Sequence, residues 1–260
     1  MPASFYRPTG AEGSFAATSA TIGPWDTKLQ HGSPPATLLM RAIEKAYSRD
    51  DVRVARVTFD FFGPVPVDEV HVTAEQVRPG ARVELTRARL SAGGRTAMEA
   101  SAWRIALQRG GVPLVADARP APRVPPPGGE VFEQLPSFGY GQALEWRFVE
   151  GSFFELGPAA IYTRARLPLI EGEPLSPLQR VLLMVDSANG ISSAISFIEY
   201  TFVPVALDVC VRRYPRTEWV GMRAETRIES DGIGHTTAEL FDEGGYLGTA
   251  TQTLFVGPRR

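Results

Sequence analysis

Two polar residues in the last third of the chain stand where apolar residues are expected. Asp186 follows Leu182 by four residues, so it lies on the apolar stripe of a predicted helix. Gln252 alternates with Ala250 and Leu254 in a predicted strand, which places it on the inward face. Because burial raises the pKa of a carboxyl group towards neutrality, Asp186 could act as a general base. The amide of Gln252 could accept one hydrogen bond and donate others.

Both residues also have a structural interpretation. Burying a carboxylate is costly, so Asp186 could instead lie at the solvated edge of the stripe or cap the broken turn at Asn189 and Gly190. Gln252 could face outward from its strand. Ser187, next to Asp186, lacks the G-x-S-x-G context of a nucleophilic serine, so a serine hydrolase triad is not expected.

The helix that carries Asp186 has clear starting signals. Ser176 is predicted as its N-cap, Pro177 suits the first helical position, and Gln179 can close a capping box. An earlier helix is predicted to begin in the same way, with Ser33 as its N-cap and a proline after it.

Strands are predicted after each helix. Residues 55–107 and 202–256 contain alternating segments interrupted by short turn signals, which is typical of an antiparallel meander. Residues 132–157, by contrast, are rich in aromatic side chains and follow no regular pattern.

The two halves of the chain resemble each other. The segment SPPATLLMRA aligns with SPLQRVLLMVD after one inserted residue, and ASAWRI aligns with ATQTLF. These alignments indicate an internal duplication. Ala42 then corresponds to Asp186 and Ala102 to Gln252, so only the second half has both polar groups. We therefore expect one site per chain.

The Pro/Gly-rich residues 108–130 are predicted to be a linker. They separate an N-terminal repeat over residues 1–107 from a C-terminal repeat over residues 131–260, which carries the expected site. In each repeat a single apolar helix must be covered by a bent antiparallel sheet, which gives an α+β fold.

Several segments resemble acyl-CoA thioesterases of the thioesterase II-like group. They are HG-x(5)-LLMRA, LEWRFVEG, EGEPLSPLQRVLLMVDSANG, and the stretch from PRTEWV to ATQTLFV. The resemblance implies a double hot-dog fold, with two repeats that each wrap a bent antiparallel β-sheet around a central helix. It also implies a homo-oligomer that hydrolyses a fatty acyl-CoA to free acid and CoA in fatty acid metabolism.

In that family a helix Asp, a strand Ser or Thr, and a last-strand Gln hold and activate the water that attacks the thioester. The resemblance places the Asp at Asp186 and the Gln at Gln252. At the third position Asp208 stands where Ser or Thr is expected, and Thr201 aligns only after a shift. Either Asp208 substitutes as a hydrogen-bond acceptor, or Thr201 reaches the site, or the site is impaired.

Thioester hydrolysis also needs donors to the developing oxyanion, and backbone N–H groups near a helix N-terminus can supply them. His31 and Gly32, just before the first predicted helix, are one such place.

Two arginine pairs could contact the phosphates of CoA. They are Arg212 with Arg213, and Arg259 with Arg260. Solvated surface charge is the commoner explanation for pairs of this kind.

Composition argues against several other classes of protein. The 260 residues carry a formal net charge of −2, so neither nucleic acid nor an anionic membrane is an expected partner. One cysteine allows no disulfide framework, and the three histidines lack metal-ligand spacing, so we expect no metal. The sequence contains no P-loop and no Rossmann glycine pattern, so we expect no cofactor. The sequence shows no signal-peptide pattern or membrane-spanning segment, so we expect a cytoplasmic protein.

Two other functions stay open. A hot-dog hydratase or dehydratase would act on acyl thioesters through a histidine with an acidic partner, but no histidine is near Asp186 in the sequence. A non-catalytic acyl-CoA-binding protein would explain why Pro204 and Asp208 stand in the strand where the hydroxyl is expected.

Overall fold

The computed structural model describes residues 2–108, 110–115 and 120–259. In the described chain, twelve strands form one sheet in which all neighbouring strands are antiparallel. The strands are β1 (Tyr6–Pro8), β2 (Ser14–Ala17), β3 (Val52–Phe61), β4 (Glu69–Arg78), β5 (Val83–Ala92), β6 (Arg95–Ala106), β7 (Leu144–Glu150), β8 (Ala159–Ala165), β9 (Tyr200–Val211), β10 (Val220–Ile228), β11 (Ile233–Asp242) and β12 (Gly245–Pro258).

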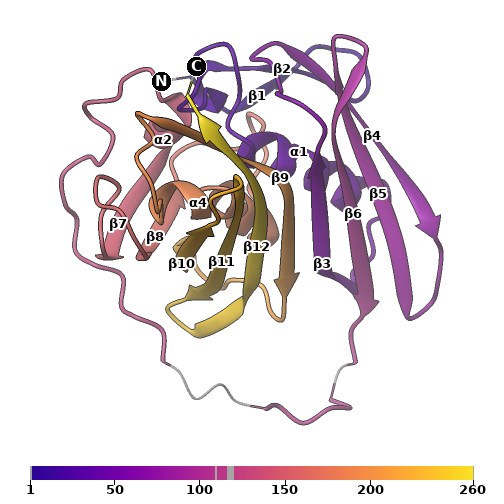
Figure 1. Cartoon of the computed structure of the whole chain (residues 1–260). Helices are drawn as coiled ribbons and strands as arrows, with labels where there is room; N and C mark the ends of the chain where they lie inside the picture. The colour runs from indigo at the N-terminus through magenta and orange to yellow at the C-terminus, as the bar shows by residue number, and fades with distance from the viewer. Residues whose placement is uncertain (1, 109, 116–119, 260) are drawn as a thin grey trace.

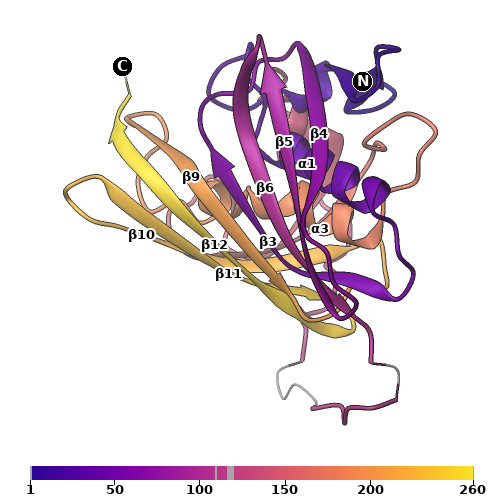
Figure 2. The same ribbon diagram turned by 90° about the vertical axis from the view of Figure 1, so that its right-hand side faces the viewer.

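The helices are few and short compared with the sheet. They are a 3-10 turn (Ser19–Thr21), α1 (Ser33–Ala46), α2 (Gly139–Ala143), α3 (Pro177–Val185) and α4 (Ala188–Ile191). Helix α1 packs against β4, β5 and β6, whereas α3 packs against β8 and β10, and the two helices also contact each other. Figure 2 shows α1 and α3 together on one side of the strands.

The sheet has the same strand order in its two halves. The order is β2-β4-β5-β6-β3 in the first half and β8-β10-β11-β12-β9 in the second, with β1 and β7 at the outer edges. The halves are joined where β3 pairs with β9, from Arg56 opposite Cys210 to Asp60 opposite Ala206. Figure 1 shows this junction between the violet β3 and the orange β9.

The predicted start of α3 is confirmed. The side chain of Ser176 accepts a hydrogen bond from the backbone N–H of Gln179, and the side chain of Gln179 accepts one from the backbone N–H of Ser176. Pro177 fills the first helical position, where the missing N–H costs nothing. The carboxylate of Glu44 at the end of α1 accepts hydrogen bonds from both capping side chains, which ties the two helices together.

The predicted start of α1 is wrong by one residue. Gly32 is the N-cap and Ser33 is the first helical residue. Glycine has no side chain, so the N-cap residue cannot accept a capping hydrogen bond. The reason is local, because the backbone N–H of Ser33 donates instead to Nδ1 of His31 over 3.1 Å. An imidazole therefore takes the place of the expected hydroxyl cap.

The apolar face of α3 is buried, as the spacing of its residues predicted, and joins one large core with the inner face of the sheet. Each large aliphatic side chain buried in such a core contributes roughly 1.5–3 kcal/mol. Among the described residues, no helix combines the length and the apolar character that crossing a bilayer requires.

Candidate active site

The carboxyl group of Asp186 lies buried at the end of α3. Asp186 is the C-cap residue of that helix, and α4 begins two residues later. Only 4% of the residue is exposed, and Oδ1 accepts a hydrogen bond from Nε2 of Gln252 over 2.9 Å. A solvated position at the edge of the stripe is therefore excluded, and the carboxyl group is both buried and hydrogen-bonded.

Gln252 points inward from β12, as the alternation of that strand predicted. Its Oε1 accepts a hydrogen bond from the backbone N–H of Asn189 over 3.1 Å. Its Nε2 donates to the carboxylate of Asp186 and also to the main-chain oxygen of Asp186, over 3.2 Å. Because the two ends of the amide face different partners, only one orientation of the side chain satisfies both.

Burial is the main influence on the acidity of Asp186. It raises the pKa of this carboxyl group to about 7, although hydrogen bonds from Gln252 and from the backbone of Gly32 favour the ionised form. The backbone of Gly32 lies close to this carboxyl group, since a Cβ added to Gly32 would lie 2.5 Å from Oδ2 of Asp186. A carboxyl group with a pKa near neutrality can both accept and release a proton at pH 7.

The ring of His31 lies beside the same carboxyl group. Its Nδ1 is 3.5 Å from Oδ2 of Asp186. Burial lowers the pKa of His31 to about 3, so the ring is neutral at physiological pH and makes no ion pair with the carboxylate. No local pattern indicates this approach, because His31 precedes the first helix and Asp186 ends a helix in the other half of the chain.

Tyr140 supports the histidine from α2, in a segment with no regular sequence pattern. The rings of Tyr140 and His31 stack with centroids 3.8 Å apart and planes 5° from parallel. The hydroxyl of Tyr140 donates to the main-chain oxygen of Leu183 over 2.6 Å and lies 2.7 Å from Oγ of Ser187. Sequence analysis missed this residue, because no periodicity singles it out.

A cavity of about 670 Å³ opens onto Asp186, His31 and Gly32. Such a volume is typical of pockets that bind small molecules. Its wall is mostly apolar and rich in aromatic side chains, which are Trp25, Phe61, Phe62, Phe132, Phe138, Trp146, Phe153, Phe197 and Phe202. The cavity can therefore hold an apolar group with its reactive end against the buried carboxyl.

Thr201 lines the cavity but lies far from Gln252. It pairs with Gly257 of β12, which is five residues from Gln252, or roughly 17 Å along the strand. The residue of β9 that pairs with Gln252 is Leu207, which is buried. Strand β9 therefore presents an apolar side chain, and no hydroxyl, directly opposite Gln252.

Asp208 lies on the outer face of the sheet, and its expected role in the site is wrong. It pairs with Thr251, whose side chain points away from that of Gln252. Nε of Arg56 donates to its Oδ2 over 2.7 Å. The register is regular from Gly248 opposite Val211 to Thr253 opposite Ala206, so Leu207 and not Asp208 shares the inner face with Gln252.

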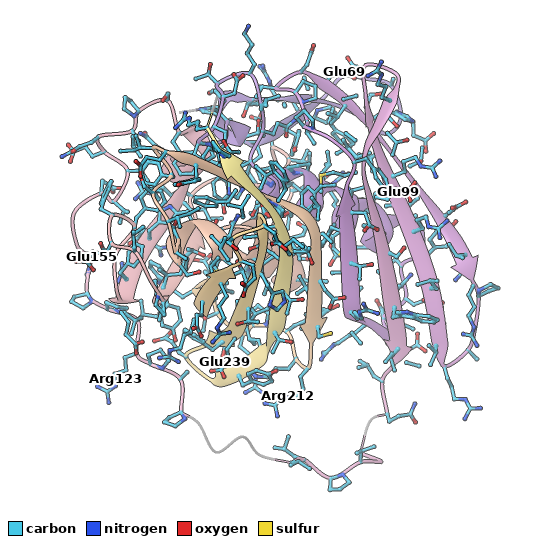
Figure 3. The ribbon with its side chains drawn as sticks, in the orientation of Figure 1. Glu69, Glu99, Arg123, Glu155, Arg212 and Glu239 are labelled. Carbon is cyan, nitrogen blue, oxygen red and sulfur yellow. The ribbon has the colours of Figure 1, made fainter. Side chains whose placement is uncertain are left out.

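The expected phosphate contacts of Arg212 and Arg213 do not fit their positions. Both follow the end of β9 that is roughly 35 Å along the strand from Thr201. Arg213 forms an ion pair with the buried carboxylate of Asp242, and Arg212 lies over the ring of Tyr246. Figure 3 labels Arg212 near the turn that joins β11 to β12, at the opposite end of the sheet from the C-terminus.

Arg259, unlike Arg212 and Arg213, lines the cavity. Its Nη1 donates to the main-chain oxygen of Phe197 over 3.1 Å, and its guanidinium lies over the ring of Trp25. Arg260, its expected partner, is outside the described residues. Within the part of the chain that the structure describes, no cluster of three or more His, Cys, Asp or Glu side chains could hold a metal ion.

Two family models match the sequence over most of its length. Residues 21–105 match the acyl-CoA thioesterase N-terminal domain, and residues 116–256 match the acyl-CoA thioesterase C-terminal domain. The chain belongs to the acyl-CoA thioesterase family. The resemblance seen in the sequence is thereby confirmed, and the site containing Asp186 and Gln252 lies in the C-terminal thioesterase domain.

Solved structures share the fold of this thioesterase-family chain at low sequence identity. A protein with a hot-dog fold from Alicyclobacillus acidocaldarius is 16% identical, with a TM-score of 0.73 over 98% of this chain and 96% of the other. The acyl-CoA thioesterase II TesB2 from Mycobacterium marinum is 14% identical, with a TM-score of 0.68 over 97% and 95%. The TesB protein from Mycobacterium avium subspecies paratuberculosis is 14% identical, with a TM-score of 0.68 over 96% and 95%.

These similarities establish the hot-dog fold of the chain. A search of curated protein sequences found no match.

Proposed function

We propose that the protein hydrolyses the thioester bond of an acyl-CoA to give a free acid and CoA. The observation that carries this proposal is the buried carboxyl group of Asp186, oriented by Gln252 and facing an apolar cavity. Its pKa of about 7 suits a group that must take up and release a proton near neutral pH. Membership of the acyl-CoA thioesterase family supports the same reaction.

In the proposed reaction the acyl chain occupies the aromatic-lined cavity and the thioester carbonyl lies near Asp186. The ionised carboxylate takes a proton from water while the water oxygen forms a bond with the carbonyl carbon. The carbon–sulfur bond then breaks, and the CoA thiolate recovers the proton from Asp186. Gln252 acts as a positioning residue, because both hydrogens of its amide are directed at Asp186.

We further propose that the two halves are hot-dog repeats that arose by duplication, as their common strand order supports. The boundaries at residues 1–107, 108–130 and 131–260 stay predictions, as do the homo-oligomer and the cytoplasmic location. Ala42 and Ala102 occupy the corresponding positions of the first repeat, so only the second repeat has both polar groups.

One observation favours a second candidate, a hydratase or dehydratase that acts on acyl thioesters. No histidine is near Asp186 in the sequence, yet in the structure Nδ1 of His31 lies 3.5 Å from that carboxylate. This candidate needs the ring to act as a base, whereas Nδ1 already accepts the N–H of Ser33. Hydrolysis therefore stays the better supported function.

The decisive experiment measures thiol release from a panel of acyl-CoAs of short to long chain length. We expect release of CoA by the wild-type protein and a loss of roughly 100-fold or more in Asp186→Asn, because a general base contributes on this scale. Asp60→Asn, an exposed carboxylate on the outer face of β3, is the matched control and should keep full activity.

The other outcomes of this assay are equally informative. Hydration of an enoyl-CoA without thiol release would support the second candidate. Binding of acyl-CoA without turnover would support a non-catalytic binding protein, in line with the apolar Leu207 opposite Gln252. Full activity of Asp186→Asn would contradict the proposed mechanism.

A further inference from the structure

Hydrolysis of a thioester places negative charge on the carbonyl oxygen, and this charge needs a hydrogen-bond donor. The N-terminal turn of α1 is the expected source of backbone donors, but most of its N–H groups already have partners. The N–H of His31 donates to the oxygen of Thr21, and that of Ala36 donates to the oxygen of Gly32. The N–H of Ser33 donates to the ring of His31.

The remaining positions of this turn add no free backbone donor. Pro34 and Pro35 have no N–H. The backbone of Gly32 faces the carboxyl group of Asp186 and favours its ionised form. The backbone donors expected at His31 and Gly32 are therefore all engaged, and a donor near this helix must come from a side chain.

The imidazole of His31 can supply this hydrogen-bond donor. Because Nδ1 accepts the N–H of Ser33, a neutral ring carries its own hydrogen on Nε2. Among the residues that the structure describes, Nε2 has no hydrogen-bond partner. The fully buried polar side-chain atoms that lack a hydrogen-bond partner belong to Glu84, Thr86, Arg104 and Thr163. Nε2 of His31 is not one of them, so this atom is accessible from outside the protein interior. Since His31 lines the cavity, an accessible Nε2–H on its ring is available to a substrate bound there.

The surroundings keep this donor neutral and fixed. The ring of Tyr140 stacks on that of His31 at 3.8 Å, and the hydroxyl of Tyr140 is held by the main-chain oxygen of Leu183. Burial opposes protonation of the imidazole, as its lowered pKa indicates. A rigid donor of this kind needs no reorganisation when charge develops on the substrate.

We propose that the side chain of His31 is a catalytic residue that donates its Nε2–H to the carbonyl oxygen of the bound thioester. This inference rests on the proposed hydrolysis and assigns the oxyanion donor of the same site. No proton is transferred from the ring, so the hydrogen bond strengthens in the transition state and returns to its original strength afterwards. Tyr140 and the N–H of Ser33 act as positioning groups.

The kinetic test compares two variants. His31→Phe keeps an aromatic ring on Tyr140 but removes both nitrogens, and we expect kcat to fall roughly 100-fold or more with little change in KM. His31→Gln retains an N–H donor at the end of a side chain, and we expect it to recover at least about a tenth of the wild-type kcat. Because a neutral donor does not titrate near pH 7, the pH midpoint of kcat/KM should stay near 7 in both variants.

Two kinetic outcomes would overturn the proposal. One is a kcat for His31→Phe within about threefold of wild type. The other is equal inactivity of both variants when thermal unfolding shows that they are folded. A pH midpoint displaced by more than one unit in His31→Phe would instead assign the ring to proton transfer or to tuning of Asp186.

A binding experiment keeps this test separate from the test of hydrolysis. An acyl-CoA ketone, in which CH₂ replaces sulfur, retains the carbonyl oxygen, whereas an alkyl-CoA thioether lacks it. We expect His31→Phe to bind the ketone about tenfold or more weakly than wild type, measured by calorimetry, and to bind the thioether equally well. Equal loss for both ligands would contradict the proposed donor even if the wild-type protein released no thiol.

Discussion

Nε2 of Gln252 lies 2.9 Å from Oδ1 of Asp186, in a buried site where the carboxyl has a pKa of about 7. A donor at this distance favours the ionised carboxylate, so it works against the burial that raises the pKa. The balance between the two effects sets the pH at which Asp186 becomes a base. Several consequences of this relationship can be measured.

The first prediction concerns pH and the variant Gln252→Met. A base must be ionised to accept a proton, so the kcat/KM of the wild-type protein should rise with pH and level off above about 7. In Gln252→Met the carboxylate loses its donor, so the pKa of Asp186 should rise and the midpoint should move to higher pH. A shift of one unit would lower activity by about tenfold in the rising limb.

The pH profile of thiol release checks this expectation. Thr253→Ser, on the outer face of the same strand, serves as the control because its side chain is exposed. If the midpoint of Gln252→Met stayed at that of wild type, Gln252 would not set the acidity of the base.

The second prediction concerns stability. Because the pKa of Asp186 is raised from 3.8 to about 7 in the folded state, the folded protein binds more protons than the unfolded chain between these values. The contribution of Asp186 to stability is therefore complete below about pH 4 and is lost as the pH rises through about 7. From pH 5 to pH 8 the loss amounts to about 2–3 kcal/mol.

Urea unfolding of wild type and Asp186→Asn at both pH values measures this contribution. We expect the stability of wild type relative to the variant to fall by the stated amount between pH 5 and pH 8. The neutral His31 is present in both proteins, so its own titration cancels in the comparison. If the difference in unfolding free energy between wild type and Asp186→Asn did not change with pH, folding would not raise the pKa of Asp186.

The parts of the site that could be predicted are those that a pattern within a single helix or strand indicates. Asp186 and Gln252 were identified because a polar residue interrupts a local pattern of period 3.6 or 2, and because Ala42 and Ala102 occupy the matching positions. The capping box at Ser176 is also local. Asp208 was misplaced because its assignment needed the pairing of β9 with β12, which sets Leu207 and not Asp208 opposite Gln252.

The approach of His31 to Asp186 could not be predicted in the same way. It depends on α1 and α3 meeting across the two halves of the chain, and on the ring of Tyr140 from residues 132–157, which have no regular pattern. Contacts between distant segments are set by tertiary packing, and no periodicity in the chain encodes them. Helices α1 and α3 and the strands that follow each of them were predictable, whereas β7 and the approach of His31 to the carboxyl came only from the structure.

The third prediction distinguishes the arginines at the two ends of the sheet. Arg259 lines the cavity, so Arg259→Ala should raise the KM for acyl-CoA about three- to tenfold, the range for one exposed charge contact. Arg212→Ala should leave KM unchanged, because Arg212 lies at the far end of the sheet. The difference should shrink at high ionic strength, since salt screens exposed charges. Equal effects of the two variants would place the phosphates of CoA elsewhere.

The last prediction concerns the backbone beside Oδ2. Gly32 has φ −68° and ψ −23°, a conformation open to any L-residue, so Gly32→Ala would not strain the chain itself. Its Cβ would, however, lie 2.5 Å from Oδ2 of Asp186 and 2.8 Å from Cε1 of Phe61. Because both neighbours are packed, the carboxyl must move, and a displacement of about 1 Å can cost roughly 100-fold in rate.

We therefore expect Gly32→Ala to lower kcat by about 10- to 100-fold while the protein stays folded. Gly63→Ala is the matched control, since Gly63 also lines the cavity but its added Cβ would meet no atom within 4 Å. Thiol release gives the rates, and thermal unfolding shows whether overpacking alone has destabilised the variant. Wild-type activity in Gly32→Ala would mean that Oδ2 tolerates displacement, and the reacting oxygen of Asp186 would then have to be Oδ1, which Gln252 already holds.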